Sequence, residues 1–339
     1  MGFNISGKDI FTSRQVILMR CRILIQWNKV MQTSKYKYRF NKILLLVVIC
    51  FIIPGPLLSQ DLEPRFLSPS PVGMNFAVIA TAYSIGNVLF DQALPLLDTE
   101  VQMFSVSPAF ARSINIFGLS GLLSAVLPIA TATWNATLDN RDTSTTRTGF
   151  SDPTIAFAVD FIGAPALKGK EYAAHKQKTI IGAVLKVRIP LGQYNIEEFF
   201  NLSTNRWSID FRLGLAQKIG RFVLEGYLNA WFFTTNTNFF GGNTVAQDPI
   251  YAAQVHISYI FARGTWAAVS YGQSTGGKTT INGVHEDNAQ KNNRIGATFS
   301  LPISSGFSLK FVYTSGITTR FGADFDNYIV AMQYRWGGI

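Results

Sequence analysis

The stretch Trp207-Ser-Ile-Asp-Phe-Arg-Leu-Gly-Leu-Ala-Gln-Lys218 decides the fold of this chain. Its large apolar residues occupy every second position, and the charged residues Asp210 and Arg212 occupy positions between them. A β-strand has a side-chain period of two, so the two sets lie on opposite faces. One face suits hydrocarbon and the other suits water.

The next stretch, 221–233, repeats the alternation, with Leu224 on one face and Glu225 on the other. Similar segments of about ten residues recur over 74–336, which is typical of a membrane β-barrel. The sequence therefore predicts an all-β fold, a transmembrane antiparallel β-barrel of about 12 strands. The strands are expected near 74–83, 101–111, 121–134, 153–162, 179–190, 206–218, 221–233, 250–261, 265–273, 293–302, 307–314 and 326–336.

A soluble antiparallel sandwich also alternates, with its apolar face turned inward. The lengths of the connections favour the barrel, because short turns alternate with long polar loops, as they do when periplasmic turns are short and extracellular loops long. The long loops are 234–249, 274–292 and 315–325. The connection 163–178 breaks this rule, and Tyr172 to Gln177 is expected to form a helical turn there.

One short turn predicts a register. If Ile219-Gly220 forms a two-residue turn, Asp210 lies opposite Asn229 and Arg212 lies opposite Tyr227.

Aromatic residues near strand ends are expected to form girdles at the two membrane interfaces. Ordinary β-propensity, which also enriches aromatic residues in strands, is the alternative. The residues expected in the girdles include Trp134, Trp207, Trp231, Tyr334 and Trp336.

The N-terminus has the layout of a signal peptide. Residues 35–42 are basic, residues 43–53 are an unbroken apolar run, and Pro54-Gly-Pro56 ends that run. The run is shorter than the roughly 20 residues of a membrane-spanning helix, although an uncleaved anchor is the alternative. We expect residues 1–60 to be an N-terminal extension and cleaved signal peptide, with Met31 as an alternative start, and residues 61–339 to form the barrel.

Removal of residues 1–60 changes the electrostatics of the chain. Nine of the 30 Lys and Arg residues and one of the 20 Asp and Glu residues lie there, which leaves 21 against 19 and a net charge of +2 rather than +10. The basic composition of the whole chain is therefore no sign of nucleic-acid binding. Both cysteines, Cys21 and Cys50, lie in the same part, so the mature chain is expected to contain neither a disulfide nor a reactive thiol.

Charged and polar residues on the inward phase of the strands are the candidate functional residues. In a barrel they face the lumen, where they either line a wet path and set its selectivity or pair as a structural ladder. The candidates are Lys186, Arg188, Asp210, Arg212, Glu225, His256, Arg294, Lys310 and Arg335. Three of them, Lys186, Arg188 and Arg212, lie on neighbouring strands and predict a basic patch that favours anions.

His256 and Ser258 lie two apart on one strand and share a face. Outer-membrane phospholipase A has a catalytic His and Ser at this spacing, but the sequence fixes no third group to orient the pair. The pair is also expected to face the lumen, whereas a phospholipase must reach lipid. We assign no catalytic residue, no metal site and no cofactor, since metal-ligand spacings and phosphate-binding loops are absent from the sequence.

Two short motifs carry a family resemblance. Gly149-Phe-Ser-Asp-Pro153 opens one strand, and Lys186-Val-Arg-Ile-Pro-Leu-Gly-Gln-Tyr194 closes the next. Together they resemble the outer-membrane proteins associated with the meta pathway of phenol degradation, which are usually described as transporters. The resemblance covers roughly 61–339. It implies a barrel and the uptake of small, often aromatic, compounds, but it supplies no binding residues.

The sequence thus favours a channel or transporter for passive uptake of small solutes, aromatic or anionic ones among them, in the outer membrane of a diderm bacterium. Its expected partners are outer-membrane lipid, the solutes and the outer-membrane assembly machinery, with no nucleic acid. A structural barrel without a solute path and a membrane-embedded lipid hydrolase that uses His256 and Ser258 are the alternatives. The fold does not choose among them, because function resides in the site.

Overall fold

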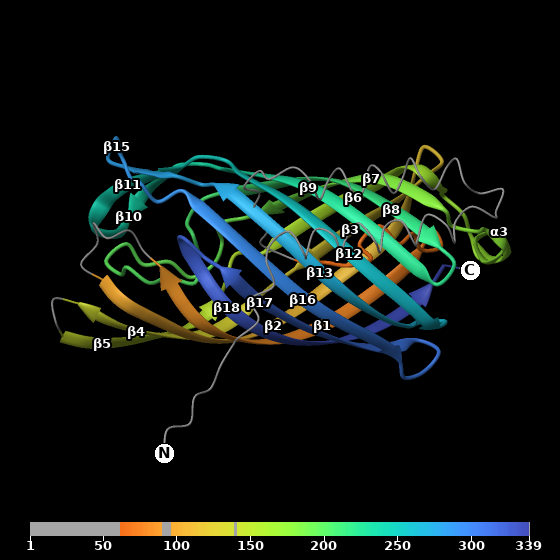
Figure 1. Ribbon diagram of the computed structural model, residues 1–339, viewed down its shortest axis with the longest axis horizontal. Coiled ribbons are helices and arrows are strands. Elements are labelled where there is room, and N and C mark those ends of the chain that lie inside the picture. The colour runs from red at the N-terminus through yellow and green to blue at the C-terminus, as the bar shows by residue number, and fades with distance from the viewer. Residues whose placement is uncertain (1–61, 90–95, 139–140, 339) are drawn as a thin grey trace, which may run out of the picture. The chain divides into compact units, whose positions relative to one another are not determined.

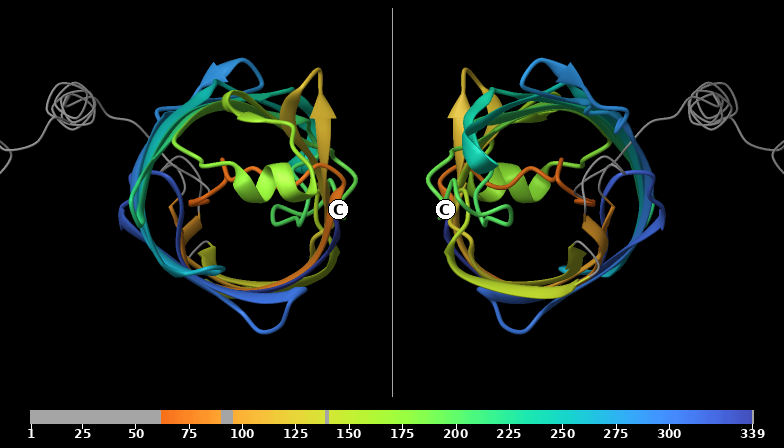
Figure 2. Two further views of the ribbon diagram at one scale, coloured as in Figure 1. Left: turned by 90° about the vertical axis from the view of Figure 1, so that its right-hand side faces the viewer. Right: turned by 90° about the vertical axis from the view of Figure 1, so that its left-hand side faces the viewer.

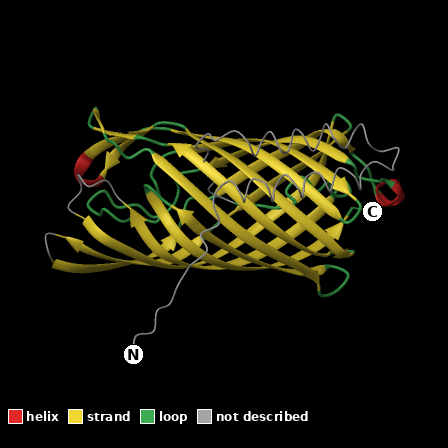
Figure 3. Cartoon of the chain, viewed as in Figure 1, coloured by secondary structure: helices red, strands yellow, loops and turns green. Residues whose placement is uncertain are grey.

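The computed structural model of the protein describes residues 62–89, 96–138 and 141–338. The expected signal peptide, the alternative start at Met31 and the cleavage position near Gln60 lie outside the described residues. Strands make up most of the described chain, as the yellow arrows in Figure 3 show. Within the described residues, none of the helices has the length and apolar character needed to cross a membrane.

Twelve antiparallel strands close into a barrel, seen from the side in Figure 1 and end-on in Figure 2. The barrel closes because β1 pairs with β2, so that each of the twelve strands is hydrogen-bonded to a strand on both sides. The wall consists of β1 (Met74–Leu89), β2 (Leu96–Ile116), β3 (Leu119–Val126), β6 (Thr154–Pro165), β7 (Thr179–Arg188), β8 (Ser208–Ile219), β9 (Phe222–Phe233), β12 (Ile250–Ala262), β13 (Thr265–Gly276), β16 (Gln290–Pro302), β17 (Phe307–Thr318) and β18 (Gly322–Gly337).

An additional hairpin, β4 (Ile129–Leu138) and β5 (Arg141–Phe150), extends the wall beyond the ring. Strand β2 is long enough to pair with β3 along one part and with β4 along another. Pro128 lies between β3 and β4, where a residue without an N–H interrupts a ladder. The predicted strand 121–134 therefore merged two strands, and β5 was missed because its run of Thr and Ser has no apolar alternation.

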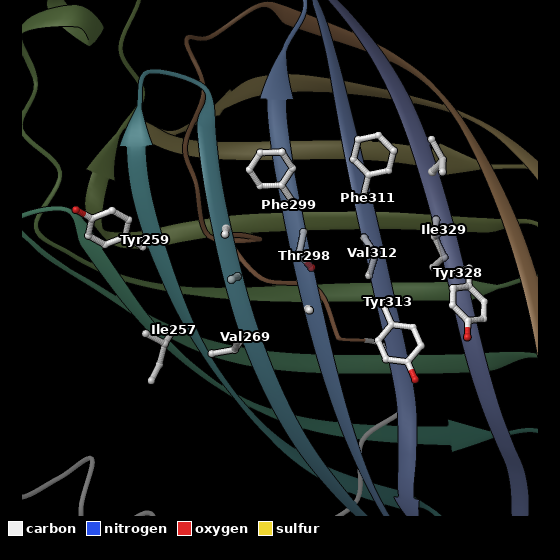
Figure 4. A pocket seen from close by; sticks show the side chains of 14 residues that line it. Ile257, Tyr259, Val269, Thr298, Phe299, Phe311, Val312, Tyr313, Tyr328 and Ile329 are labelled. Carbon is white, nitrogen blue, oxygen red and sulfur yellow. The ribbon is translucent and has the colours of Figure 1, made fainter.

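The two faces of the wall match the prediction. Phe211 and Leu213 are 48 % and 42 % exposed, whereas Arg212 between them is fully buried on the lumen side. Figure 4 shows part of the outer wall, where Phe299 and Tyr313 project from neighbouring strands around a hollow of about 780 Å³ with an almost wholly apolar lining. In a membrane barrel this surface faces hydrocarbon.

The aromatic residues divide between the two faces, which corrects part of the girdle prediction. Trp207, Tyr334 and Trp336 are exposed on the outside of the wall, but Trp134 and Trp231 are only 9 % and 8 % exposed and face the lumen. The prediction considered only how close these residues are to the strand ends. It overlooked that both residues alternate in step with the inward-facing side chains of their strands.

The predicted register of the β8–β9 hairpin is wrong by two residues. Ile219 pairs with Phe222, so Gly220 and Arg221 form the turn, and Arg212 lies opposite Asn229. Gly220 has a φ of 60°, a conformation that a β-branched residue such as Ile219 disfavours. A shift of two residues leaves every side chain on its predicted face.

Short and long connections lie at opposite ends of the barrel, which we call the turn end and the loop end. The connection 163–178 lies at the turn end and contains the helix α3 (Gly169–Ala174), which begins three residues before the predicted helical turn. At the loop end, the long loops form a small sheet of four strands. These are β10 (Asn236–Phe239), β11 (Asn243–Gln247), β14 (Thr279–Ile281) and β15 (Val284–His285), with the 3-10 turn η2 (Phe240–Gly242) between the first two.

Residues 62–73, which we call the lumen segment, run inside the barrel and not along its wall. They form the orange trace that crosses the interior in Figure 2. Leu67 is only 1 % exposed and packs in one apolar cluster with Ile180 and Tyr227 of the wall. Nothing in the alternation pattern predicts this segment, because it forms no strand.

Candidate functional site in the lumen

Glu63 anchors the lumen segment to two adjacent strands. Its Oε2 atom accepts a hydrogen bond from Lys186 Nζ at 2.6 Å and another from Arg212 NH1 at 2.8 Å. Burial alone would raise the pKa of the Glu63 carboxyl, but Lys186 and Arg212 outweigh burial and hold that pKa below its usual range. The ionised carboxylate therefore offsets part of the charge in the predicted basic patch.

The backbone of the lumen segment also bonds to the wall. The Arg65 N–H donates to Glu225 Oε2 at 2.6 Å, and Tyr227 donates its hydroxyl to Glu225 Oε1 at 2.7 Å. The Leu67 N–H in turn donates to the Tyr227 hydroxyl at 3.3 Å. The Arg65 guanidinium lies 5.3 Å from the ring centre of Trp266. The segment is thus held by charge, by hydrogen bonds and by apolar packing together.

The connection 163–178 holds the other end of the lumen segment. The Tyr172 hydroxyl donates to the Pro69 carbonyl at 2.7 Å, and the Val72 N–H donates to the Leu167 carbonyl at 2.9 Å. Burial raises the pKa of Tyr172, so this phenol stays a neutral donor. The unexpected length of this connection thus has a structural reason, because it reaches back to the segment.

Free space remains beside the lumen segment. A cavity of about 380 Å³ lies between the segment and the strands on its other side. Its lining is mixed and includes Arg65, Ser124, Asp160, Lys310 and Gln333. The segment therefore narrows the lumen without filling its whole cross-section.

A larger cavity, the loop-end vestibule, occupies the loop end of the barrel. It measures about 820 Å³ and lies beneath the connection 189–207 and the small sheet. Aromatic and polar side chains share its lining. Phe200 stacks on Trp134 with ring centres 5.3 Å apart, and the ring centres of Phe199 and Phe239 lie 6.1 Å apart. A mouth built from packed aromatic rings offers flat apolar surfaces to a solute.

The two motifs behind the family resemblance meet at this mouth. Asp152, only 5 % exposed, accepts hydrogen bonds from the Gly192 N–H at 3.1 Å, from the Ser203 hydroxyl at 2.5 Å and from the Thr204 N–H at 3.0 Å. A Cβ on Gly192 would lie 2.7 Å from the backbone of Ser151, so the close approach requires glycine. The motifs fasten the connection 189–207 across the loop end.

Arg188 lies in the loop-end vestibule and not with Lys186 and Arg212 at Glu63. Arg206 lines the same cavity, donates to Gln247 Oε1 at 2.5 Å and stacks over Phe233 at 4.7 Å. Burial and the nearby charge of Arg188 lower the pKa of Arg206 to about 10. Arg206 was not among the candidates, although it has the inward phase of Asp210 and could have been found from it.

Asp210 lies beside Arg212, with its Oδ2 atom 3.7 Å from Arg212 NH2, and it accepts a hydrogen bond from Asn229 Nδ2 at 3.3 Å. His256 is buried and its Nδ1 atom lies 2.7 Å from the Ser270 hydroxyl. Ser258 is also buried, but its hydroxyl has no hydrogen-bond partner among the described residues. The geometry therefore gives no support to a His256–Ser258 nucleophile pair.

The last three candidates are spread along the lumen. Lys310 lines the cavity beside the lumen segment, Arg294 is half-buried on the inward phase of β16, and Arg335 donates to the Ser305 carbonyl at 3.4 Å at the turn end. The structure thus brings Lys186, Asp210, Arg212, Glu225 and His256 into one belt around the lumen segment. Within the described ranges, no cluster of His, Cys, Asp and Glu suits a metal ion.

Comparison with known proteins supports the same architecture. The barrel is similar to the COG4313 outer membrane channel from Pseudomonas putida F1, with a TM-score of 0.69 and 19 % identity over 81 % of this chain and 100 % of that one. It is also similar, less closely, to the β domain of the Bordetella autotransporter BrkA, with a TM-score of 0.45 and 11 % identity over 78 % of this chain and 100 % of that one. None of the curated proteins matches the chain.

A family model matches residues 78–324, which include all the wall strands in whole or in part. That range contains both motifs, which together hold the connection 189–207 in place at the loop end. The chain therefore belongs to the family described as "Putative MetA-pathway of phenol degradation".

Proposed function

We propose that this protein is an outer-membrane channel of a diderm bacterium that lets small solutes diffuse past its lumen segment. The observation that carries the proposal is the incompletely filled lumen, with a cavity of about 820 Å³ at the loop end and another of about 380 Å³ beside the segment. The similarity to a solved outer membrane channel supports it through the fold. In this proposal, outer-membrane lipid surrounds the wall, and the assembly machinery of that membrane inserts it.

The selectivity that we propose is a preference for anions. Lys186 and Arg212 share the carboxylate of Glu63, so the unshared positive charge nearest the mouth belongs to Arg188 and Arg206. A charge influences permeation only within about 8 Å at physiological ionic strength, which favours groups at a narrow mouth. Aromatic solutes fit the lining of the loop-end vestibule and the description of the family.

A structural barrel without a solute path is the second candidate, because the lumen segment is bonded to the wall at both of its ends. Liposome swelling distinguishes the two. We expect vesicles with the purified protein to swell in a small sugar such as arabinose, and to swell faster when residues 62–72 are deleted. Absence of swelling with the wild type would support the sealed barrel, and swelling only after the deletion would identify the lumen segment as the seal. Reversal potentials in a salt gradient, measured on the same preparation, should show anion preference, and a cation preference would remove the basic mouth as its cause.

A further inference from the structure

We propose that the loop-end vestibule is a binding site for small organic anions with a flat apolar body, in which Arg188 and Arg206 hold the anionic group. This inference rests on the proposed channel function, since it names the class of solute that the mouth captures. It differs from a general preference for anions because it requires a saturable site.

The vestibule has the size and lining of a ligand site. Its volume of about 820 Å³ lies within the usual range for sites that hold small molecules. The stacked rings of Trp134 and Phe200 form part of one side, and Phe233 and Phe325 line other parts. The aromatic rings offer flat faces on which a planar apolar group can pack, and the polar side chains of the same lining leave places for a charged or polar substituent.

The two guanidinium groups line the vestibule, Arg188 from the last residue of β7 and Arg206 from the connection just before β8. Arg188 is paired with Ser208 across the β7–β8 ladder, and Arg206 lies two residues before Ser208, so both have the inward phase. A guanidinium presents several N–H donors in one plane and matches a carboxylate well. Two such groups on one side of an aromatic cavity form a natural receptor for a carboxylate.

Neither guanidinium is neutralised by an acid in the described part of the chain. The hydrogen-bond partner of the Arg206 guanidinium is a neutral amide, that of Gln247, and the Arg188 guanidinium makes neither an ion pair nor a hydrogen bond with another described residue. Both guanidinium groups line the same cavity, so their positive charges repel, and burial together with the charge of Arg188 lowers the pKa of Arg206 to about 10. A bound carboxylate would offset that repulsion.

The acids near the vestibule have other roles or oppose the ligand. Asp152 is occupied by the connection 189–207, and Glu198 is paired with Arg147. Glu286 also lines the vestibule, next to β14, where its N–H bonds to the Thr279 carbonyl. The negative charge of Glu286 would disfavour a bound anion. Removing that charge should therefore strengthen benzoate binding, and the direction of this change tests whether the ligand binds as an anion.

Calorimetric titration of the purified, folded protein tests the inference with three probes. Benzoate carries both the ring and the carboxylate, benzyl alcohol keeps the ring without the charge, and acetate keeps the charge without the ring. We expect benzoate to bind saturably and at least about tenfold more tightly than either of the others, the ratio that one charge-assisted hydrogen bond supplies. Equal binding of benzoate and benzyl alcohol by the wild type would overturn the inference.

Substitutions assign the site. R188Q and R206Q should each weaken benzoate binding by about tenfold and leave benzyl alcohol unchanged. R206K keeps the charge and should retain part of the affinity, and E286Q should bind benzoate more tightly than the wild type. R221Q, at the turn end, is the matched control. Retention of the benzoate preference in the R188Q/R206Q double variant would refute the assignment, provided that the variant shows the heat-modifiable folded band.

The failure of this inference and of the proposed channel can be told apart. Swelling and conductance in simple salt measure the path, whereas titration measures the site. A protein that conducts but binds benzoate no better than benzyl alcohol is a channel without this site. If the protein binds benzoate through Arg188 and Arg206 but never conducts, the binding site is present and the channel proposal is wrong.

Discussion

Glu63 is the residue through which the lumen segment and the strand wall share charge. Its carboxylate lies between Lys186 and Arg212, and the latter is fully buried. A buried guanidinium without an anion would be costly, so the acid stabilises both the segment and the wall. No local pattern connects Glu63 with Lys186 and Arg212, which strand alternation alone places on one face of neighbouring strands.

We expect E63Q to loosen the lumen segment and to raise the open fraction or the conductance of single channels. A hydrogen bond to a charged group contributes about 1.5–3 kcal/mol, and we expect the lower end because the Glu63 side chain is 39 % exposed and is therefore screened. E197Q, at an exposed position of the connection 189–207, is the control. Identical conductance in wild type, E63Q and E197Q would show that Glu63 does not secure the segment.

The lowered pKa of Glu63 implies that channel conductance depends on pH. When the segment leaves the wall, Glu63 regains an ordinary pKa near 4.5, and docking lowers that pKa. Docking is therefore fully favourable above that value and weakens as the pH falls below it. The charged groups that act on Glu63 are Lys186, Arg212 and Lys310. Conductance should stay level down to about pH 5 and rise as the pH falls from about 4.5 to about 3 in the wild type, and it should rise less in E63Q.

At the scale of the strand, the two faces differ in what they tolerate. Leu213 faces outward and is 42 % exposed, whereas Glu225 is 4 % exposed on the lumen side. An Arg on the lipid face at mid-bilayer costs about 2–4 kcal/mol. L213R should therefore reduce the heat-modifiable folded band, while E225Q should assemble normally. Equal assembly of the two variants would contradict the assignment of faces.

The connection 189–207 depends on a single carboxylate. Asp152 accepts four hydrogen bonds from Gly192, Ser203 and Thr204. In D152N, the amide nitrogen would face N–H or O–H donors, at a cost of about 1–3 kcal/mol. We expect limited proteolysis to cut within this connection while the barrel remains folded.

The matched control for that experiment is D142N, at the exposed hairpin of β4 and β5, where Asp142 accepts one bond from Thr137. This change should leave the protease pattern unaltered. If D152N is as resistant as D142N, Asp152 does not hold the connection in place.

At the scale of the whole molecule, cleavage near Gln60 stays a prediction, because residues 1–61 lie outside the described residues. Leu62 is buried within the lumen segment, so cleavage there would leave the new N-terminus close to the segment. We expect intact-mass measurement of protein from outer membranes to give a chain that begins near Asp61. Recovery of a species that still contains residues 43–53 would count against processing.

The sequence by itself determined most of the wall strands, their faces and the sorting of most connections by length, but it merged β3 with β4 and missed β5. These follow from a side-chain period of two, which each segment displays alone, as Leu213 beside Arg212 illustrates. The motif around Asp152 was also visible in the sequence, but its role was not. It became clear only when the chain brought Gly192 within 3.1 Å of the carboxylate.

Only the tertiary structure decided what occupies the lumen. Glu63 and Arg212 are 149 positions apart, and Arg65 and Glu225 are 160 positions apart. Such pairs arise because the closed ring brings distant strands around one segment, and alternation along a strand says nothing of what enters the ring. The separation of Arg188 from Lys186 and Arg212 has the same origin. The height of a side chain along the barrel axis depends on the strand register and on how the loops fold. The alternation of faces along one strand carries no information about either.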